Sequence, residues 1–232
     1  MRTQTLLYWI SRPLVLGYSR LMLQMDTQAR HPLPDGPKII AANHPSTTDP
    51  FFVAGMLRRQ SFILIKDVLF QVPVLGRYLR ASGHIPVVAG SGQAALDEAV
   101  QRLREGHTVV IFPEGILSPE GGFNPARSGV GRLALASGAP VIPVGIQLDR
   151  QYLRTIRSTV RGQVEYGAWY LNGPYHLTSG RPLYFNGDPE NRPLVRSVSE
   201  QVMRHIIELA HQSELRMKPE RIPLPEVITI NS

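Results

Sequence analysis

The sequence Lys38-Ile39-Ile40-Ala41-Ala42-Asn43-His44-Pro45-Ser46-Thr47-Thr48-Asp49-Pro50 joins an apolar run to a polar loop and a helix start. Residues 38–42 are typical of a buried strand, which would deliver His44 at its carboxyl end. Asp49 stands directly before a proline, and this pair is typical of the first residues of a helix. A buried strand that leads through a short polar loop into a helix indicates an α/β fold.

The rest of the chain continues this alternation of strands and helices. Such alternation predicts a three-layer α/β/α domain with a mainly parallel or mixed central sheet. We expect one domain over residues 31–215, after an amphipathic helical segment at residues 1–30 and before a peripheral tail at residues 216–232. Further strands are predicted at residues 61–65, 108–112, 139–148, 163–171 and 181–186, and helices at residues 50–58, 92–105, 128–137 and 193–211.

His44 and Asp49 are candidates for acid–base chemistry. If the loop folds back, the Asp49 carboxylate can bond one ring nitrogen of His44 and leave the other free to accept a proton from a hydroxyl group. Backbone N–H groups near the following helix start could then hold a developing oxyanion. The alternative is that Asp49 only caps the helix and that His44 is an ordinary polar residue at a strand end.

A second candidate segment is Phe112-Pro113-Glu114-Gly115, which follows the apolar run 108–111. The simplest structural interpretation is a strand that closes into a turn. In parallel α/β sheets, however, sites lie outside the carboxyl ends of the strands. We therefore expect Glu114 and His44 to share one site.

Together with Val141-Ile142-Pro143-Val144, these two motifs resemble those of the glycerolipid acyltransferases, and in particular the 1-acylglycerol-3-phosphate acyltransferases. The resemblance covers residues 38–148, with a similar ending to about residue 187. It implies transfer of a fatty acyl group from acyl-coenzyme A or acyl carrier protein to a lipid hydroxyl, most simply from lysophosphatidic acid to phosphatidic acid in phospholipid biosynthesis. It also implies that His44 is the catalytic base, that Asp49 supports it, and that no cofactor is needed beyond the acyl donor. The substrate-binding residues that we expect are Asn43, Phe112, Pro113, Glu114, Gly115 and Lys66.

Two basic residues of the family pattern are missing from this chain. Ala89 stands where the family has a basic residue after its Gly-x-Ile stretch, and Leu117 stands where Thr-Arg-Ser is common. Each charge-assisted contact with a phosphate contributes about 1.5–3 kcal/mol, so the headgroup of the acceptor is left open, and a different lysolipid is the alternative. Cations near the motifs that could compensate are Lys66, Arg77, Arg80 and Arg127.

Composition constrains the partners of the protein. The absence of cysteine excludes a cysteine nucleophile and thiolate metal sites. The net charge of +7 favours an anionic partner, and the basic residues are not interleaved with aromatics as in single-strand binders. We therefore expect a phospholipid surface and a phosphorylated acyl donor as partners, and no nucleic acid.

The N-terminus favours a membrane surface. Its apolar runs are broken by Arg12-Pro13 and by Arg20, and none approaches the ~20 residues of a membrane span. We interpret residues 1–27 as interfacial helices, with core packing of an amphipathic helix pair as the alternative. The expected location is peripheral, on the cytoplasmic face of the cell membrane. A basic strip of Arg150, Arg154, Arg157 and Arg161 would be a second contact if that segment were helical.

Two functions of other classes remain open. A metallohydrolase could use His44, Asp49, His84 and Glu114 as ligands, although their spacing matches no familiar zinc motif. A catalytically silent lipid-binding protein could keep the fold without the two basic residues. His44→Ala would discriminate between these functions, because it affects acyl transfer, metal content and membrane binding differently.

Overall fold

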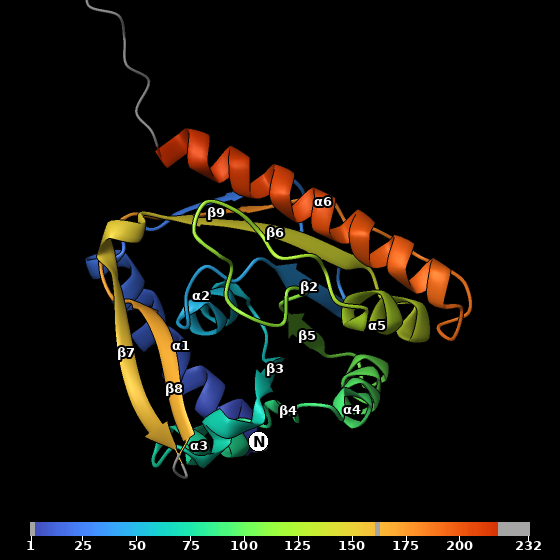
Figure 1. Cartoon of the computed structure of the whole chain (residues 1–232), viewed down its shortest axis with the longest axis horizontal. Coiled ribbons are helices and arrows are strands. Elements are labelled where there is room, and N and C mark those ends of the chain that lie inside the picture. Colours follow the sequence, from blue (N-terminus) through green and yellow to red (C-terminus); the bar gives the residue numbers. More distant parts are fainter. Residues whose placement is uncertain (1–2, 161–162, 218–232) are drawn as a thin grey trace, which may run out of the picture.

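The computed structural model describes residues 3–160 and 163–217, in which a seven-stranded sheet lies between layers of helices (Figure 1). The strands follow the order β1-β9-β6-β2-β5-β3-β4, and only the β6–β9 pair among them is antiparallel. The predicted three-layer α/β/α fold with a mainly parallel sheet is confirmed. The strands of this sheet are β1 (Asp26–Ala29), β2 (Lys38–Ala42), β3 (Ser61–Lys66), β4 (Ile85–Val87), β5 (Thr108–Ile111), β6 (Val141–Leu148) and β9 (Tyr175–Ser179).

The central strands are buried on both faces, so the sheet carries two separate cores. Along β2, Ile39 and Ala41 pack into one core, and Ile40 and Ala42 pack into the other, as the alternation of side chains in a strand requires. The first core is covered by α4 (Gly92–Arg104), α5 (Gly129–Ser137) and α6 (Arg192–Met217). The second is covered by α1 (Thr3–Met22), α2 (Asp49–Met56), α3 (Leu75–Ala81) and the 3-10 helix η1 (Asp67–Gln71).

The N-terminal segment differs from its prediction in two ways. Helix α1 is one continuous helix that runs through Pro13, whereas more than one helix was expected over residues 1–27. Residues 26–29 do not extend the helical segment but pair with β9 at the edge of the sheet, which therefore begins before residue 31. Tyr18 of α1 faces inward, and its ring stacks on that of Phe52 of α2, with ring centroids 6.3 Å apart.

A separate two-stranded arm, β7 (Leu153–Val160) and β8 (Gln163–Tyr170), stands beside the main sheet (Figure 1). The helix considered for Arg150 to Arg161 is therefore wrong. Arg150 lies in the short 3-10 helix η2 (Arg150–Tyr152), whereas Arg154 and Arg157 lie in a strand, an odd number of residues apart, and so on opposite faces. The β-branched residues Thr155 and Ile156 favour this extended conformation. Arg161 lies outside the described residues.

One strand predicted in the C-terminal part of the chain is wrong. The strand predicted at residues 181–186 is reduced to a single bridge between Leu183 and Val141, and the neighbouring strand is β9 instead. The predicted helix at residues 193–211 is confirmed as part of the longer α6. The tail predicted from Lys218 onward lies outside the described residues.

Candidate active site

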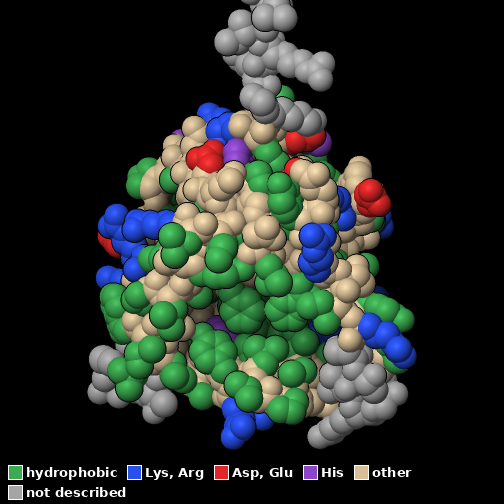
Figure 2. Space-filling view, turned by 90° about the vertical axis from the view of Figure 1, so that its left-hand side faces the viewer, with side chains coloured by type: hydrophobic (Ala, Val, Ile, Leu, Met, Phe, Trp, Pro, Cys, Tyr) green, Lys and Arg blue, Asp and Glu red, His purple; other side chains and the backbone are tan. Residues whose placement is uncertain are grey.

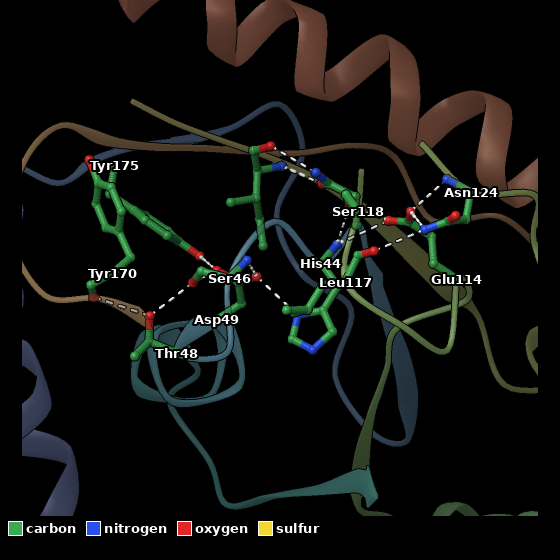
Figure 3. A network of polar contacts seen from close by, with 12 residues as sticks. His44, Ser46, Thr48, Asp49, Glu114, Leu117, Ser118, Asn124, Tyr170 and Tyr175 are labelled. Atoms are coloured by element: carbon green, nitrogen blue, oxygen red, sulfur yellow. Dashed lines mark hydrogen bonds and ion pairs between the residues drawn. The ribbon is translucent and has the colours of Figure 1, made fainter. Parts of the chain in front are cut away.

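The loop between β2 and α2 brings His44 and Asp49 together (Figure 3). The Nδ1 atom of His44 lies 3.0 Å from Oδ2 of Asp49. Asp49 is fully buried in the first turn of α2, and the residue before it, Thr48, occupies the N-cap position without a side-chain cap. The Asp49 carboxylate therefore faces His44 rather than capping the helix.

The surroundings of Asp49 fix the position of its carboxylate and the orientation of His44. The carboxylate accepts hydrogen bonds from the backbone N–H of Ser46 at 2.7 Å, from the Ser46 hydroxyl at 2.7 Å and from the Tyr175 hydroxyl at 3.0 Å. Three donors stabilise the ionised form of a buried carboxylate. An ionised Asp49 can only accept from His44, so the ring proton lies on Nδ1 and Nε2 is free to accept another proton.

Tyr175 was not identified from the sequence, because it enters the site from β9 and lies 126 residues after Asp49 in the chain. Its ring is fully buried, and burial, followed by the negative charge of Asp49, raises the pKa of its hydroxyl well above 10. Tyr175 is therefore protonated near neutral pH and donates to Asp49. No signal in the local sequence around residue 175 indicates this contact.

Glu114 organises a second loop directly behind His44. It is 1% exposed, and its Oε1 accepts from the His44 backbone N–H at 3.1 Å and from the Ser118 hydroxyl at 2.5 Å. Its Oε2 accepts from the backbone N–H of Asn124 at 2.7 Å and from the Asn124 side chain at 3.0 Å. Both oxygens are thus engaged within the protein, and Glu114 holds the loop after β5 against the backbone of His44 (Figure 3). The expected contact of Glu114 with an acceptor hydroxyl stays a prediction.

The other predicted site residues have different surroundings. The Phe112 ring stacks on the His44 ring, with centroids 4.2 Å apart. The Asn43 side chain is buried and exchanges hydrogen bonds of 2.9 and 2.7 Å with the backbone of Ile146 on β6, so it joins two strands next to His44. Lys66 is exposed at the carboxyl end of β3, on the same edge of the sheet.

The backbone donors near the start of α2 differ from expectation. The N–H groups of Ser46, Thr47, Asp49 and Phe51 are hydrogen-bonded to Asp49, Ala168, Ser46 and Thr48, respectively. They are therefore not free to hold an oxyanion in this conformation. The β8 strand and the tight turn occupy these four donors, and the expected oxyanion site near the helix start stays a prediction.

The metal-binding alternative finds no support in the arrangement of the side chains. Within residues 3–160 and 163–217, no group of three or more His, Cys, Asp or Glu side chains could hold a metal ion. His84 instead accepts a hydrogen bond from the backbone N–H of Ile63 at 3.3 Å, beside Ser61 and Ser82.

The fold and the site together define a class of protein: a three-layer α/β domain with a His–Asp pair and a buried glutamate loop at the carboxyl edge of its sheet. The family model described as Acyltransferase matches residues 24–147, just over half of the chain, so the chain belongs to this acyltransferase family.

Individual relatives agree with this assignment. A 1-acyl-sn-glycerol-3-phosphate acyltransferase of Pseudomonas aeruginosa is 29% identical over 140 residues, which are 59% of this chain and 52% of that protein. One from Saccharomyces cerevisiae is 28% identical over 149 residues, 61% of this chain and 49% of that protein. The chain thus spans about half the length of these curated relatives.

A solved structure shows the same fold. The crystal structure of the 1-acyl-sn-glycerophosphate (LPA) acyltransferase PlsC from Thermotoga maritima matches with a TM-score of 0.55 and 22% identity. The match covers 89% of this chain and 94% of that one.

Proposed function

We propose that this chain transfers a fatty acyl group from an acyl thioester, acyl-coenzyme A or acyl carrier protein, to the free hydroxyl of lysophosphatidic acid and so forms phosphatidic acid. The observation that carries the proposal is the His44–Asp49 pair, with Nδ1 of His44 tied to a buried carboxylate and Nε2 left free. Relatives from Pseudomonas aeruginosa, Brassica napus and Saccharomyces cerevisiae are named 1-acyl-sn-glycerol-3-phosphate acyltransferases, and these names support this substrate.

The proposed reaction needs only this one base. Nε2 of His44 accepts the proton of the acceptor hydroxyl while that oxygen attacks the carbonyl carbon of the thioester. Asp49 stabilises the imidazolium that forms. The tetrahedral intermediate collapses, the carbon–sulfur bond breaks, and the departing thiolate takes the proton back from His44. The ester and the free thiol are the products, and His44 is neutral again.

We also propose that the protein works as a peripheral membrane protein on the cytoplasmic face of the cell membrane. None of the helices in residues 3–160 and 163–217 is both long enough and apolar enough to cross a bilayer. Helix α1 nevertheless presents an outward stripe of apolar side chains three to four residues apart, which the protein itself does not cover. These exposed side chains are Leu6, Trp9, Ile10, Leu14 and Leu21.

The same face of the molecule includes the β7–β8 arm. Figure 2 shows hydrophobic side chains gathered in a hollowed face between α1 and this arm. On the arm, Ile156, Val164 and Tyr166 are exposed, and so are Arg154 and Arg157. Apolar side chains with nearby arginines suit the interface of an anionic bilayer, where the lipid substrates of the proposed reaction reside.

Acyl transfer by the purified protein tests the proposed reaction. We expect labelled acyl-coenzyme A and lysophosphatidic acid to yield labelled phosphatidic acid, and His44→Ala to lower kcat by about 100- to 10,000-fold. Vesicle binding of the variant should stay at the wild-type level, which separates chemistry from membrane contact. Turnover only on a lysolipid with another headgroup would keep the chemistry and refute the acceptor. Equal turnover by His44→Ala would refute the mechanism.

A further inference from the structure

The proposed acceptor carries a phosphate monoester, yet two basic residues of the family pattern are replaced by Ala89 and Leu117. A phosphate of this charge needs cationic or N–H donors in its binding site. The positions of the remaining cations decide which of them can supply that contact.

Arg127 is the cation that packs directly on the glutamate motif. A Cβ atom added to Gly115 would lie 2.8 Å from both Cδ and Nε of Arg127 and 3.1 Å from its Cζ, so the guanidinium group lies flat against this glycine. The backbone N–H of Arg127 donates to the carbonyl of Pro113 at 2.8 Å, which anchors the residue to the same motif. Gly115 has a positive φ of 69° and no side chain, and both properties make room for the arginine.

The guanidinium group of Arg127 is available for a ligand. The residue is exposed, and among the residues that the structure describes no carboxylate lies within ion-pair distance of it. Glu114, the acidic residue of the motif, accepts hydrogen bonds on both oxygens from His44, Ser118 and Asn124. The planar fork of an arginine can bind two phosphate oxygens at once.

Two of the other cations are hydrogen-bonded to backbone carbonyls. Arg150 donates to the carbonyls of Ser118 and Pro119, at 3.0 and 2.6 Å, and so holds the loop after the motif. Arg80 donates to the carbonyl of Phe70 in η1. The loop that carries Arg127, in contrast, is tied to the backbone of His44 through Glu114 and Ser118.

We propose that Arg127 forms the phosphate subsite of this chain and holds the phosphate monoester of the lysolipid acceptor in place of the two missing basic residues. This assignment rests on the proposed function. The donor coenzyme A also carries phosphates, so the shared chemistry is a phosphate group, and the experiment must separate the two sources.

Steady-state kinetics of Arg127→Gln and Arg127→Lys test this assignment. We expect Arg127→Gln to raise the KM for lysophosphatidic acid by about 10- to 100-fold with little change in kcat, because it removes a charge-assisted contact. Arg127→Lys keeps the charge but loses the two-point contact, so its KM should lie between those of the wild type and Arg127→Gln. Inorganic phosphate should compete with the acceptor in the wild type and more weakly in Arg127→Gln. Arg104→Gln, an exposed arginine on α4, removes the same charge and should behave as wild type.

To separate the phosphate of the donor from that of the acceptor, the kinetics are measured with two acyl donors. These are acyl-coenzyme A and acyl-pantetheine, a thioester without phosphate. A KM for acyl-coenzyme A that rises in Arg127→Gln, while the acceptor KM does not, would place the phosphate of the donor at Arg127 and overturn the assignment. If Arg127→Gln is active and its KM for lysophosphatidic acid is unchanged, the assignment of Arg127 is overturned, but the proposed function is not. A fall in kcat and in the thermal unfolding midpoint of both Arg127 variants, without a change in acceptor KM, would show a purely structural role and also overturn it. A wild type that does not acylate lysophosphatidic acid with either donor would overturn the proposed function and this assignment together.

Discussion

At the scale of single residues, the position of the Asp49 carboxylate depends on contacts from two distant parts of the chain. Ser46 and His44 come from the same loop, whereas Tyr175 comes from β9. The spacing of His44 and Asp49 allowed their contact to be expected, beside the alternative of a helix cap, because a five-residue separation within one loop is a local property. The contact with Tyr175 requires that β9 lies beside β6 in the sheet, and local sequence carries no information about that pairing.

His84, which lies outside the site, gives the stability of the protein a dependence on pH. Burial lowers the pKa of His84 to about 4, whereas the unfolded chain binds this proton near pH 6.5. Between these two values the unfolded state binds more protons than the folded state. The free energy of unfolding therefore falls as the pH is lowered from 6.5 toward 4, and this residue adds no pH dependence above 6.5.

We expect the wild type to lose about 2 kcal/mol more stability than His84→Asn between pH 7 and pH 5, because the asparagine cannot take up the proton. Urea unfolding at the two pH values measures this difference. His31→Asn, at an exposed position, serves as the control and should lose as much as the wild type. Parallel pH dependence in the wild type and His84→Asn would contradict this account.

At the scale of elements, the central strands could be predicted and the peripheral ones could not. β2, β5 and β6 are almost entirely buried, so their sequences are continuous apolar runs that identify them. The arginines of η2 and β7, which are Arg150, Arg154 and Arg157, stand four and three residues apart and so imitate a helical face. Its extended conformation follows from pairing with β8, a contact that the spacing within β7 does not reveal.

The missed strand β9 has a similar explanation. Its polar residue Thr178 is fully buried and shares a 2.7 Å hydrogen bond with Ser213 of α6. Arg216 of the same helix donates to Thr178 at 2.8 Å and to Asp26 of β1 at 2.7 Å. Polar residues in a strand are tolerated when they find such partners, and these partners lie more than 30 residues away.

The contact between α6 and β6 gives a prediction at this scale. A Cβ atom on Gly145 of β6 would lie 2.0 Å from the backbone nitrogen of Ala210 and 2.2 Å from the carbonyl carbon of Leu209 on α6. Backbone atoms of a long, packed helix cannot move aside as a flexible side chain can. We expect Gly145→Ala to lower the free energy of unfolding by about 3 kcal/mol, the upper end of the usual cost of overpacking.

Denaturant unfolding measures this effect against Gly92→Ala at the start of α4. An added Cβ at Gly92 meets no atom within 4 Å, so this variant should be neutral or slightly stabilising. Equal stability of the two variants would show that α6 can shift away from β6. In that event, the close approach of the two elements would not be a fixed feature of the fold.

At the scale of the whole molecule, the two helical layers have different surfaces. Helices α4 and α6 of one layer are rich in charged and polar residues outside the core, whereas the other side has α1 and the β7–β8 arm around an apolar hollow (Figure 2). The inward stripe of α1 is fixed to the domain, since Tyr8 and Arg12 both donate to the carbonyl of Leu57. The helix is thus held in place with its outward stripe exposed.

This asymmetry predicts that membrane contact depends on one face of the molecule. Trp9 is 53% exposed, Ile10 55% and Leu14 70%, and burial of such side chains in the bilayer interface stabilises the bound state. We expect the triple variant Trp9→Ser, Ile10→Ser, Leu14→Ser to reduce binding to phosphatidylglycerol vesicles by at least about tenfold in sedimentation. Tyr166→Ser on the arm should have a smaller effect in the same direction.

The control for this face is Leu215→Ser on α6, which removes an apolar side chain that is 73% exposed on the other layer. This variant should bind vesicles as the wild type does. Added salt should weaken the binding of all variants, because arginines near an anionic surface act within a screening distance of ~10 Å at 0.1 M. If Leu215→Ser weakened binding as much as the α1 variant, membrane contact would not be confined to the hollowed face. In that case the path of the lipid acceptor toward His44 would have to be sought from another side of the sheet.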